Sequence, residues 1–254
     1  MEDREPVVTS PMTEYGQCVL PHLHVVSWLG MTKGNIGSHV YVLSGGDGLL
    51  LVDCGTPWGH ERIRRNLAHW GLRVEDVRAI LLTHGHVDHV SGGYLFEDHG
   101  AEVLGHREIQ TMVECQWEAT GAVGRMPGGY RMHGYLEDGD VIRRCGWEVT
   151  VIATPGHTRG CLSFLIAIDG ARCLFTGDLI MSNCRPGFHG DPGFSVEALV
   201  ASLLRLQGVP FDHLCHGHDV RLNDRGDLFR RSLAAYEAGD WADLGEVRGR
   251  KKAE

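Results

Sequence analysis

The sequence predicts an α/β layered fold in a single domain. Segments with the pattern of strands alternate with segments that have the period of amphipathic helices, and both halves of the chain contain strand-rich stretches. We find no repeat, proline-rich linker or block of charge that would mark a domain boundary in the 254 residues. We therefore expect one domain over residues 1–254, with loop insertions near 119–135 and 181–194 and a polar tail over 239–254.

In the first half, runs rich in Val, Leu, Ile and aromatic side chains alternate with turns, as expected of strands. The predicted strands cover residues 17–29, 38–44, 49–53, 77–82 and 101–105. Helices are predicted over 57–70 and 107–117. The first of these has Thr56 as a candidate N-cap, Pro57 at the first helical position and Gly71 as its left-handed end.

The second half begins with the glycine-rich stretch 119–135, which predicts a long loop. The predicted strands that follow cover residues 147–153, 161–168, 172–176 and 211–215. A helix is expected over 196–207, with Ser195 as its cap and Gly208 as its end. Residues 225–238 are predicted to be helical, and the polar tail 239–254 to be frayed.

Composition excludes several classes of function. The net charge of −9 disfavours a nucleic-acid partner, because a DNA-binding face would have to form against the field of the chain. No apolar run approaches the roughly 18 residues that span a bilayer, and Met1–Glu5 is charged, so neither a membrane partner nor a signal peptide is predicted. The eight cysteines contain no CxxC pair and are interpreted as reduced thiols. We expect a cytoplasmic protein with a small-molecule substrate, whose oligomeric state the sequence does not give.

The sixteen histidines are the unusual feature of the composition. Three of them and one carboxylate lie within six residues, directly after the predicted strand 77–82: His84, His86, Asp88 and His89. On an extended segment His84 and His86 point to the same side, while Asp88 and His89 lie where the chain begins to turn. Imidazole nitrogen and carboxylate oxygen suit zinc, iron, manganese or nickel, so this loop predicts ligands for two neighbouring ions.

Three further candidate ligands each follow a predicted strand and lie beside a glycine: His157, Asp178 and His218. Glycine allows the sharp turn that directs a ligand back across the ends of the strands. His216 competes with His218 for the last position. The family resemblance described next implies His218, because its position directly after the glycine matches that of the family's histidine.

The ordered motifs HxHxDH, TPGHT, TGD and GH, preceded by the LVDCG segment that contains Asp53, resemble those of the metallo-β-lactamase superfamily of hydrolases. The resemblance covers about residues 50–219. It implies a four-layer αβ/βα sandwich, two sheets face to face with helices outside, and a dinuclear site along one sheet edge. Matching residue by residue, it implies the ligand set His84, His86 and His157 for the first ion, Asp88, His89 and His218 for the second, and Asp178 as the bridge. Asp53 would support the ligand loop by hydrogen bonds.

The chemistry that this resemblance implies is hydrolysis by two divalent transition-metal ions, with zinc favoured and iron or manganese as alternatives. A metal-bridging hydroxide would attack an ester-like carbonyl of a thioester, lactone or ester. Asp88 would carry a proton to the departing atom and Asp178 would hold both ions. Asp178 stands where a cysteine would point to one class of true β-lactamase, so antibiotic hydrolysis is disfavoured.

The branch of the family is less defined. Glyoxalase II enzymes share the ligand motifs but carry a sizeable helical domain after the last histidine, where this sequence has a short segment. Quorum-quenching lactonases place a tyrosine shortly after the bridging aspartate. That position has no tyrosine here, and Tyr130 or Tyr135 of the loop could take the role. Candidate substrate contacts in the two loops are Tyr130, Arg131, His133, Arg185, Phe188 and His189.

Two other functions remain open. One is an iron-dependent oxidoreductase of the persulfide dioxygenase type on the same fold. The other is a non-catalytic binding or sensor protein that retains the metals.

Overall fold

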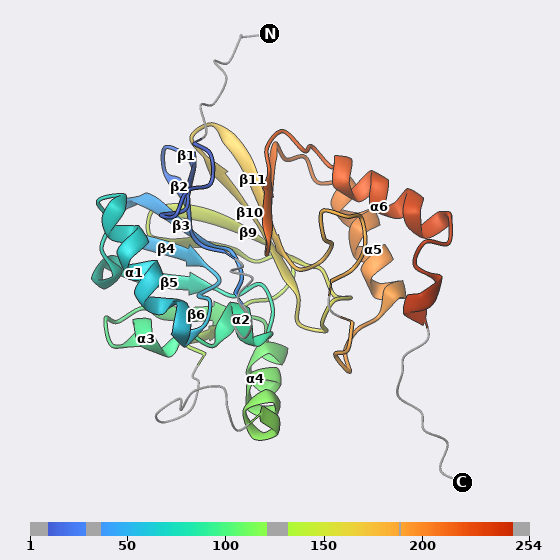
Figure 1. Cartoon of the computed structure of the whole chain (residues 1–254), viewed down its shortest axis with the longest axis horizontal. Helices are drawn as coiled ribbons and strands as arrows, with labels where there is room; N and C mark the ends of the chain where they lie inside the picture. Colours follow the sequence, from blue (N-terminus) through green and yellow to red (C-terminus); the bar gives the residue numbers. More distant parts are fainter. Residues whose placement is uncertain (1–9, 29–36, 121–131, 188, 246–254) are drawn as a thin grey trace.

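The computed structural model describes residues 10–28, 37–120, 132–187 and 189–245. Most of the predicted insertion near 119–135 lies outside these ranges. Within them the chain folds into two β-sheets that lie face to face, with helices on both outer sides (Figure 1).

The described part of the first half forms a seven-stranded sheet in the order β1-β2-β3-β4-β5-β6-β7. Its strands are β1 (Gln17–Leu20), β2 (Leu23–Ser27), β3 (Val40–Gly46), β4 (Gly48–Val52), β5 (Val77–Leu81), β6 (Glu102–Gly105) and β7 (Gly134–Tyr135). Neighbours from β1 to β4 pair antiparallel, whereas β4, β5, β6 and β7 run parallel. The parallel strands are almost wholly apolar because both of their faces are covered.

The second sheet has six strands among the described residues, in the order β13-β12-β11-β10-β9-β8. Its strands are β8 (Val141–Arg144), β9 (Trp147–Ala153), β10 (Leu162–Ile168), β11 (Ala171–Gly177), β12 (His213–His216) and β13 (Asp219–Arg221). Within the described part of this second sheet, β11 and β12 pair parallel and the other neighbours pair antiparallel.

Helices cover the outer faces of the sheets. They are α1 (His60–His69), α2 (Val87–Val90), α3 (Tyr94–Glu97), α4 (Arg107–Thr120), α5 (Val196–Gln207) and α6 (Asp227–Glu237), with short 3₁₀ turns η1 (Pro57–Gly59), η2 (Val74–Asp76) and η3 (Ala242–Gly245). Helix α5 begins as predicted, because Ser195 Oγ accepts a hydrogen bond from Ala198 N at 3.2 Å. Gly208 follows its last residue. None of the described helices combines the length and apolarity that a membrane span requires.

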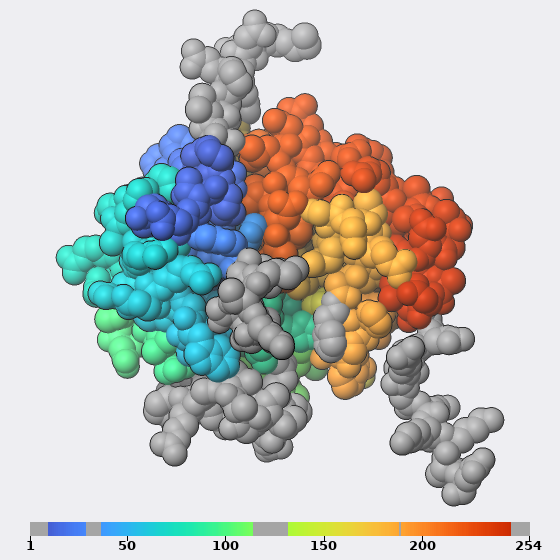
Figure 2. Space-filling view, viewed as in Figure 1, coloured from blue at the N-terminus to red at the C-terminus, as the bar shows by residue number. Residues whose placement is uncertain are grey.

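Three apolar clusters in the described residues account for the layers. The central cluster joins residues of β1 to β6 with residues of β9 to β12 and fills the space between the sheets. A second lies between the outer face of the first sheet and the helices of the first half. The third packs α5 and α6 on the outer face of the second sheet. This arrangement confirms the predicted four-layer αβ/βα sandwich, and the space-filling view shows the two halves on opposite sides of the molecule (Figure 2).

The directions of the strands explain why the predicted metal ligands lie at one edge of the two sheets. Strands β4 and β5 are parallel in the first sheet. In the second sheet β9, β11 and β12 share one direction, because β9 and β11 both pair antiparallel with β10 and β12 is parallel to β11. The loops that leave the ends of these strands carry all seven predicted metal ligands.

The C-terminal tail departs from the expectation of fraying after Gly239. Trp241 and Leu244 are buried in the third cluster, and the Trp241 Nε1–H donates to Cys184 O at 3.0 Å. These two apolar side chains anchor the 3₁₀ turn η3 to the body of the protein. Polar composition alone therefore gave a wrong prediction for residues 240–245.

Candidate metal centre

The HxHxDH segment follows β5 as predicted. His84 and His86 lie in the extended stretch after the strand, and His86 directly precedes the short helix α2. Asp88 and His89 are residues of α2, so the chain turns between the pair His84 and His86 and the pair Asp88 and His89. His84 and His89 are fully buried, whereas His86 and Asp88 are partly exposed. One short loop thus supplies four side chains that point to a common region.

The other predicted ligands come from the second sheet and meet this loop. His157 lies in the loop after β9, Asp178 directly follows β11, and His218 lies in the turn between β12 and β13. Their ligand atoms fall into three groups within 4.8 Å: His84 with His86 and His157, Asp88 with His89 and His218, and His84 with His89 and Asp178. The seven side chains therefore converge across the gap between the two sheets.

Contacts within the groups are short. His157 Nε2 lies 2.9 Å from His86 Nδ1. Asp178 contacts two histidines of the second group, with Oδ2 at 2.9 Å from His218 Nε2 and Oδ1 at 3.3 Å from His89 Nε2. Its ligand atom is also within 4.8 Å of that of His84, which belongs to the first group. Asp88 Oδ2 is 3.7 Å from His89 Nε2 and 3.8 Å from His218 Nε2.

The donor set fits two divalent transition-metal ions. Within the part of the chain that the structure describes, His84 Nε2, His89 Nε2 and Asp178 Oδ1 are buried and have no hydrogen-bond partner. Buried polar atoms normally have a partner, and leaving one without costs free energy. Neutral imidazoles and carboxylates at this spacing are ligands of zinc, iron or manganese.

The electrostatics of the cluster also favour cations. Burial lowers the pKa of His84 well below its usual value, and it lowers that of His157 to about 3, so both rings are neutral and offer lone pairs. Burial opposes the ionisation of Asp178, but His89 and His218 outweigh it and hold the pKa of Asp178 well below its usual range. Burial likewise opposes the protonation of His89, yet the surrounding carboxylates raise its pKa well above the usual value. The negative charge at the centre therefore attracts positive charge.

Asp53 holds the ligand loop from behind, as the resemblance implied. Its carboxylate accepts hydrogen bonds from Thr83 N at 2.8 Å and Thr83 Oγ1 at 2.9 Å, and it lies 2.7 Å from His89 Nδ1. Thr83 Oγ1 is in turn 3.0 Å from His84 Nδ1. Asp53 has a φ of 60°, a left-handed conformation that is uncommon for residues other than glycine. The buried hydrogen bonds of its side chain hold it there.

His216 lies outside the three groups of ligand atoms. Its ring Nε2 is 3.0 Å from Ser182 Oγ, and Ser182 Oγ donates to Asp219 Oδ2 at 2.5 Å. The His216 carbonyl accepts from the hydroxyl of Tyr41 at 2.6 Å. The ring is thus occupied by a polar network beside the centre, and it is His218 whose ligand atom lies within 4.8 Å of those of Asp88 and His89.

The predicted substrate contacts have different surroundings. Tyr130, Arg131 and Phe188 lie outside the described residues. His133 is exposed, and its Nδ1 accepts from Val103 N at 3.0 Å at the edge of the first sheet. His189 is exposed, with its ring 5.9 Å from that of Phe194.

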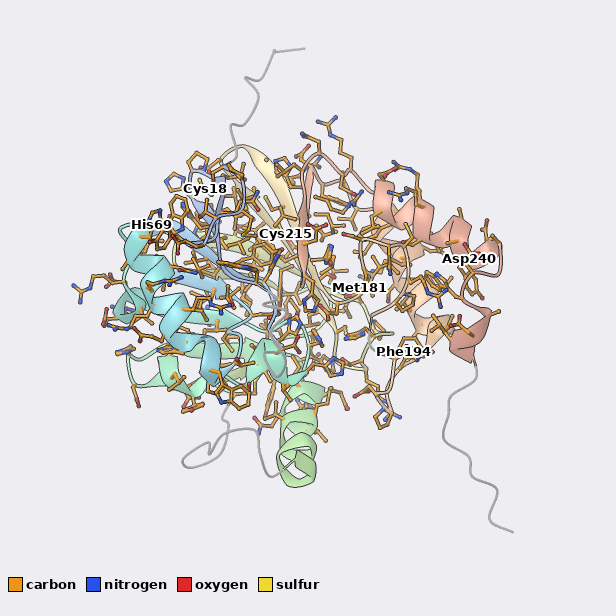
Figure 3. All side chains as sticks on the ribbon, in the orientation of Figure 1. Cys18, His69, Met181, Phe194, Cys215 and Asp240 are labelled. Carbon is orange, nitrogen blue, oxygen red and sulfur yellow. The ribbon has the colours of Figure 1, made fainter. Side chains whose placement is uncertain are left out.

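Arg185 faces away from the centre in its described contacts. Its guanidinium binds the Asp243 carboxylate at 2.7 and 2.8 Å and the Asp240 carbonyl. Asp240, labelled in Figure 3, lies beyond α6 at the outer side of the molecule. Arg185 therefore holds the C-terminal turn η3 to the loop that precedes α5.

One carboxylate beside the centre was missed by sequence reasoning. Asp191 Oδ2 lies 3.8 Å from His86 Nε2, and the side chain is 13% exposed. Burial opposes ionisation, but His86 and the Gly193 N–H outweigh it, so the pKa of Asp191 is lowered. The only sequence signal was the turn-forming Asp191-Pro192-Gly193.

Comparison with known proteins agrees with this geometry. Residues 34–218 match the model of the metallo-beta-lactamase superfamily. The hydroxyacylglutathione hydrolase of Stenotrophomonas maltophilia is 32% identical over 177 residues, which cover 69% of this chain and 58% of that protein. The enzyme of the same name from Aeromonas hydrophila is 31% identical over 189 residues, covering 74% and 63% respectively. The match thus spans about three fifths of the length of these relatives.

Solved structures show the same fold. A motif mutant of the metallo-beta-lactamase from Cronobacter sakazakii superposes with a TM-score of 0.70 at 20% identity, covering 95% of this chain and all of that one. A metallo-beta-lactamase family protein from Thermus thermophilus also gives a TM-score of 0.70, at 25% identity, covering 91% of this chain and 85% of that one. The matching family model, the shared architecture and the converging His and Asp side chains lead to one conclusion: the chain belongs to the metallo-beta-lactamase superfamily.

Proposed function

We propose that the protein is a dinuclear metal-dependent hydrolase that cleaves an ester-like carbonyl. The observation that carries this proposal is the set of ligand atoms from seven side chains, which fall into two groups of three joined by Asp178. In this proposal His84, His86 and His157 hold one ion, and Asp88, His89 and His218 hold the other. Zinc is the favoured metal, because imidazole and carboxylate ligands suit it well.

When bound, two divalent ions activate water for attack and polarise the carbonyl of the substrate. The side chains of the chain have their own tasks. Both carboxylate oxygens of Asp178 contact histidines of the second group, and Asp178 also lies within 4.8 Å of His84 of the first group, so it would join the two sites. Asp88 is the more exposed carboxylate and lies 3.8 Å from His218, so it is placed to carry a proton to the departing atom. Neither a serine nor a cysteine nucleophile is required.

The substrate class is a thioester, lactone or ester, and the relatives favour the first. Two relatives above 30% identity bear the name hydroxyacylglutathione hydrolase, and an acylglutathione is a thioester. Six cysteines are free thiols in the described part of the chain (Cys18, Cys145, Cys161, Cys173, Cys184 and Cys215), and reduced thiols are typical of the cytoplasmic location that we propose.

The proposal is tested by metal analysis of freshly purified protein together with a panel of thioester, lactone, ester and lactam substrates. We expect about two ions per chain and turnover of a thioester, lactone or ester. Asp178→Ala and His86→Ala should abolish turnover while circular dichroism shows a retained fold. His99→Ala, at an exposed histidine, is the matched control.

Three results would contradict the proposal. The first is wild-type turnover in either ligand variant. The second is oxygen consumption with a thiol or persulfide substrate, which would indicate the dioxygenase. The third is tight binding of a small acid without product, which would indicate a sensor.

A further inference from the structure

We propose that Asp191 is a positioning residue that fixes the ring of His86 for the first metal ion and so ties residues 189–194 to the metal centre. This inference rests on the proposed dinuclear centre and extends it by one residue that lies outside the predicted ligand set. It is argued from the contacts of His86, the support of Asp191 and the chemistry of imidazole.

The ring of His86 has an inner and an outer nitrogen. Nδ1 lies 2.9 Å from Nε2 of His157, inside the first group of ligands. Nε2 points to the other side, where Asp191 Oδ2 is 3.8 Å away. This distance is short enough for charge attraction and about 0.8 Å longer than a usual hydrogen bond. Asp191 is therefore beside the outer nitrogen, and it does not belong to the groups of ligand atoms.

The carboxylate of Asp191 is held in place by its own turn. Its Oδ1 accepts from Gly193 N at 2.6 Å, and its carbonyl accepts from Phe194 N at 3.0 Å. The next residue, Ser195, donates its N–H to Gly156 O at 2.9 Å. Since Gly156 directly precedes His157, the turn that carries Asp191 is fixed to the loop that carries another ligand of the same ion.

A neutral imidazole carries one proton, and its partner decides which nitrogen carries it. A carboxylate beside Nε2 of His86 keeps the proton there and leaves the Nδ1 lone pair for the ion. The other two histidines of the HxHxDH loop, His84 and His89, have their outer partner at Nδ1 instead of Nε2. Asp53 lies on Nδ1 of His89, and Thr83 Oγ1 lies on Nδ1 of His84, which leaves Nε2 of both rings facing the centre.

This comparison gives each histidine of the loop one outer acceptor. Two of these acceptors come from the first sheet, next to the ligand loop itself. Asp191 comes from the second half of the chain, immediately before α5. Occupation of the first ion site is therefore coupled to the conformation of the segment that precedes α5.

The experiment compares Asp191→Asn and Asp191→Ala with the wild-type protein and with Asp98→Asn, an exposed carboxylate after α3. Asn keeps an oxygen that accepts from Gly193 N but removes the charge beside His86. Ala removes both. Metal affinity is measured by competition with a chromophoric chelator for zinc, and the proton position on His86 is read from nitrogen-15 spectra of the zinc-loaded protein.

We expect both Asp191 variants to bind one of the two zinc ions about 10–100-fold more weakly, with the other ion and the Asp98→Asn control unchanged. We expect the wild-type His86 to carry its proton on Nε2. Wild-type affinity in Asp191→Asn with weakened binding in Asp191→Ala would overturn the inference, because only the turn would then matter. A proton on Nδ1 of His86 would overturn it too. Failure of the wild-type protein to bind zinc would refute the metal centre itself.

Discussion

Substitution of Gly217 by alanine tests the central position of Asp178 in the site. Gly217 lies between β12 and the proposed ligand His218 and is buried, and its φ is not in the left-handed region, so alanine adds no backbone strain. A Cβ at this position would lie 2.7 Å from His89 Cε1 and 3.1 Å from Asp178 Cγ, with Asp178 Oδ1 nearer still. The added methyl group therefore enters the space that the Asp178 carboxylate occupies.

The size of the displacement follows from these distances. Carbon atoms in contact are about 3.5–4.0 Å apart, so His89 or the new methyl group must move by about 1 Å and Asp178 by more. The backbone of Gly217 cannot easily retreat, because its N–H donates to Gly177 O at 2.9 Å and its carbonyl accepts from His39 N at 2.6 Å. A misplacement of about 1 Å in a catalytic site can lower the rate about 100-fold.

We expect Gly217→Ala to lower turnover about 100-fold or more and to weaken metal binding, at a cost of about 1–3 kcal/mol in stability from overpacking. Steady-state kinetics, metal titration and urea unfolding measure the three effects. Gly208→Ala is the control, since its Cβ would meet only Arg205 O, at 3.4 Å, without a positive φ. Wild-type turnover and metal content in Gly217→Ala would refute the geometry proposed for Asp178.

Two further predictions concern the surroundings of the ligands. Asp53→Asn removes the charged acceptor of His89 Nδ1. The free energy of unfolding, measured in urea, should fall by about 1–3 kcal/mol, and the metal affinity should fall about 10–100-fold. An unchanged affinity would contradict the supporting role of Asp53. Burial, and to a smaller extent the nearby His216 and His218, lowers the pKa of His39 to about 3. The unfolded chain therefore binds more protons than the folded chain between pH 6.5 and 3, and the free energy of unfolding falls as the pH falls through this window. At pH 5 the loss from His39 is about 2 kcal/mol, and His39→Gln should lose that much less stability between pH 7.5 and pH 5; equal losses in both proteins would show that His39 titrates normally.

The fold was largely predictable because its elements have strong local signals. The limits of β9 and α5 agree with the predicted 147–153 and 196–207, since apolar runs and the Ser195 cap define them. Strands with weak local patterns were missed. β8 is half exposed, with two arginines, and β13 has only three residues, so neither forms an apolar run. Both are defined by pairing with a neighbouring strand, which sequence periodicity does not report.

The candidate ligands were predictable from the sequence, whereas the residues that contact them were less so. The ligand motifs follow strands and stand out by their histidine density, and the structure brings these side chains together. Asp191 and Tyr41 carry no such signal. Asp191 is one carboxylate in an irregular loop, and Tyr41 reads as a core residue of β3. Their partners, His86 and the His216 carbonyl, lie 105 and 175 positions away, so only the fold reveals the contacts.

The alignment of the two sheets is itself part of the site. Apolar packing between the sheets is strong but has no fixed direction, so it does not by itself align the loops of one sheet with those of the other. Hydrogen bonds between the sheets lie next to the ligands and supply this alignment. Thr83 O accepts from Leu162 N at 2.8 Å, His39 N donates to Gly217 O at 2.6 Å, and Tyr41 Oη donates to His216 O at 2.6 Å.

Each of these bonds joins a residue of the first half to a residue within five positions of a ligand in the second half. Polar bonds buried at this edge are strong because little water competes for them. The same edge that carries the ligands thus fixes the relative position of the sheets. One group of candidate ligands takes His84 and His86 from the side of the first sheet and His157 from the second, so a sliding movement of the sheets would separate the proposed ligands of a single ion. The cross-sheet bonds therefore keep the centre assembled before any ion binds.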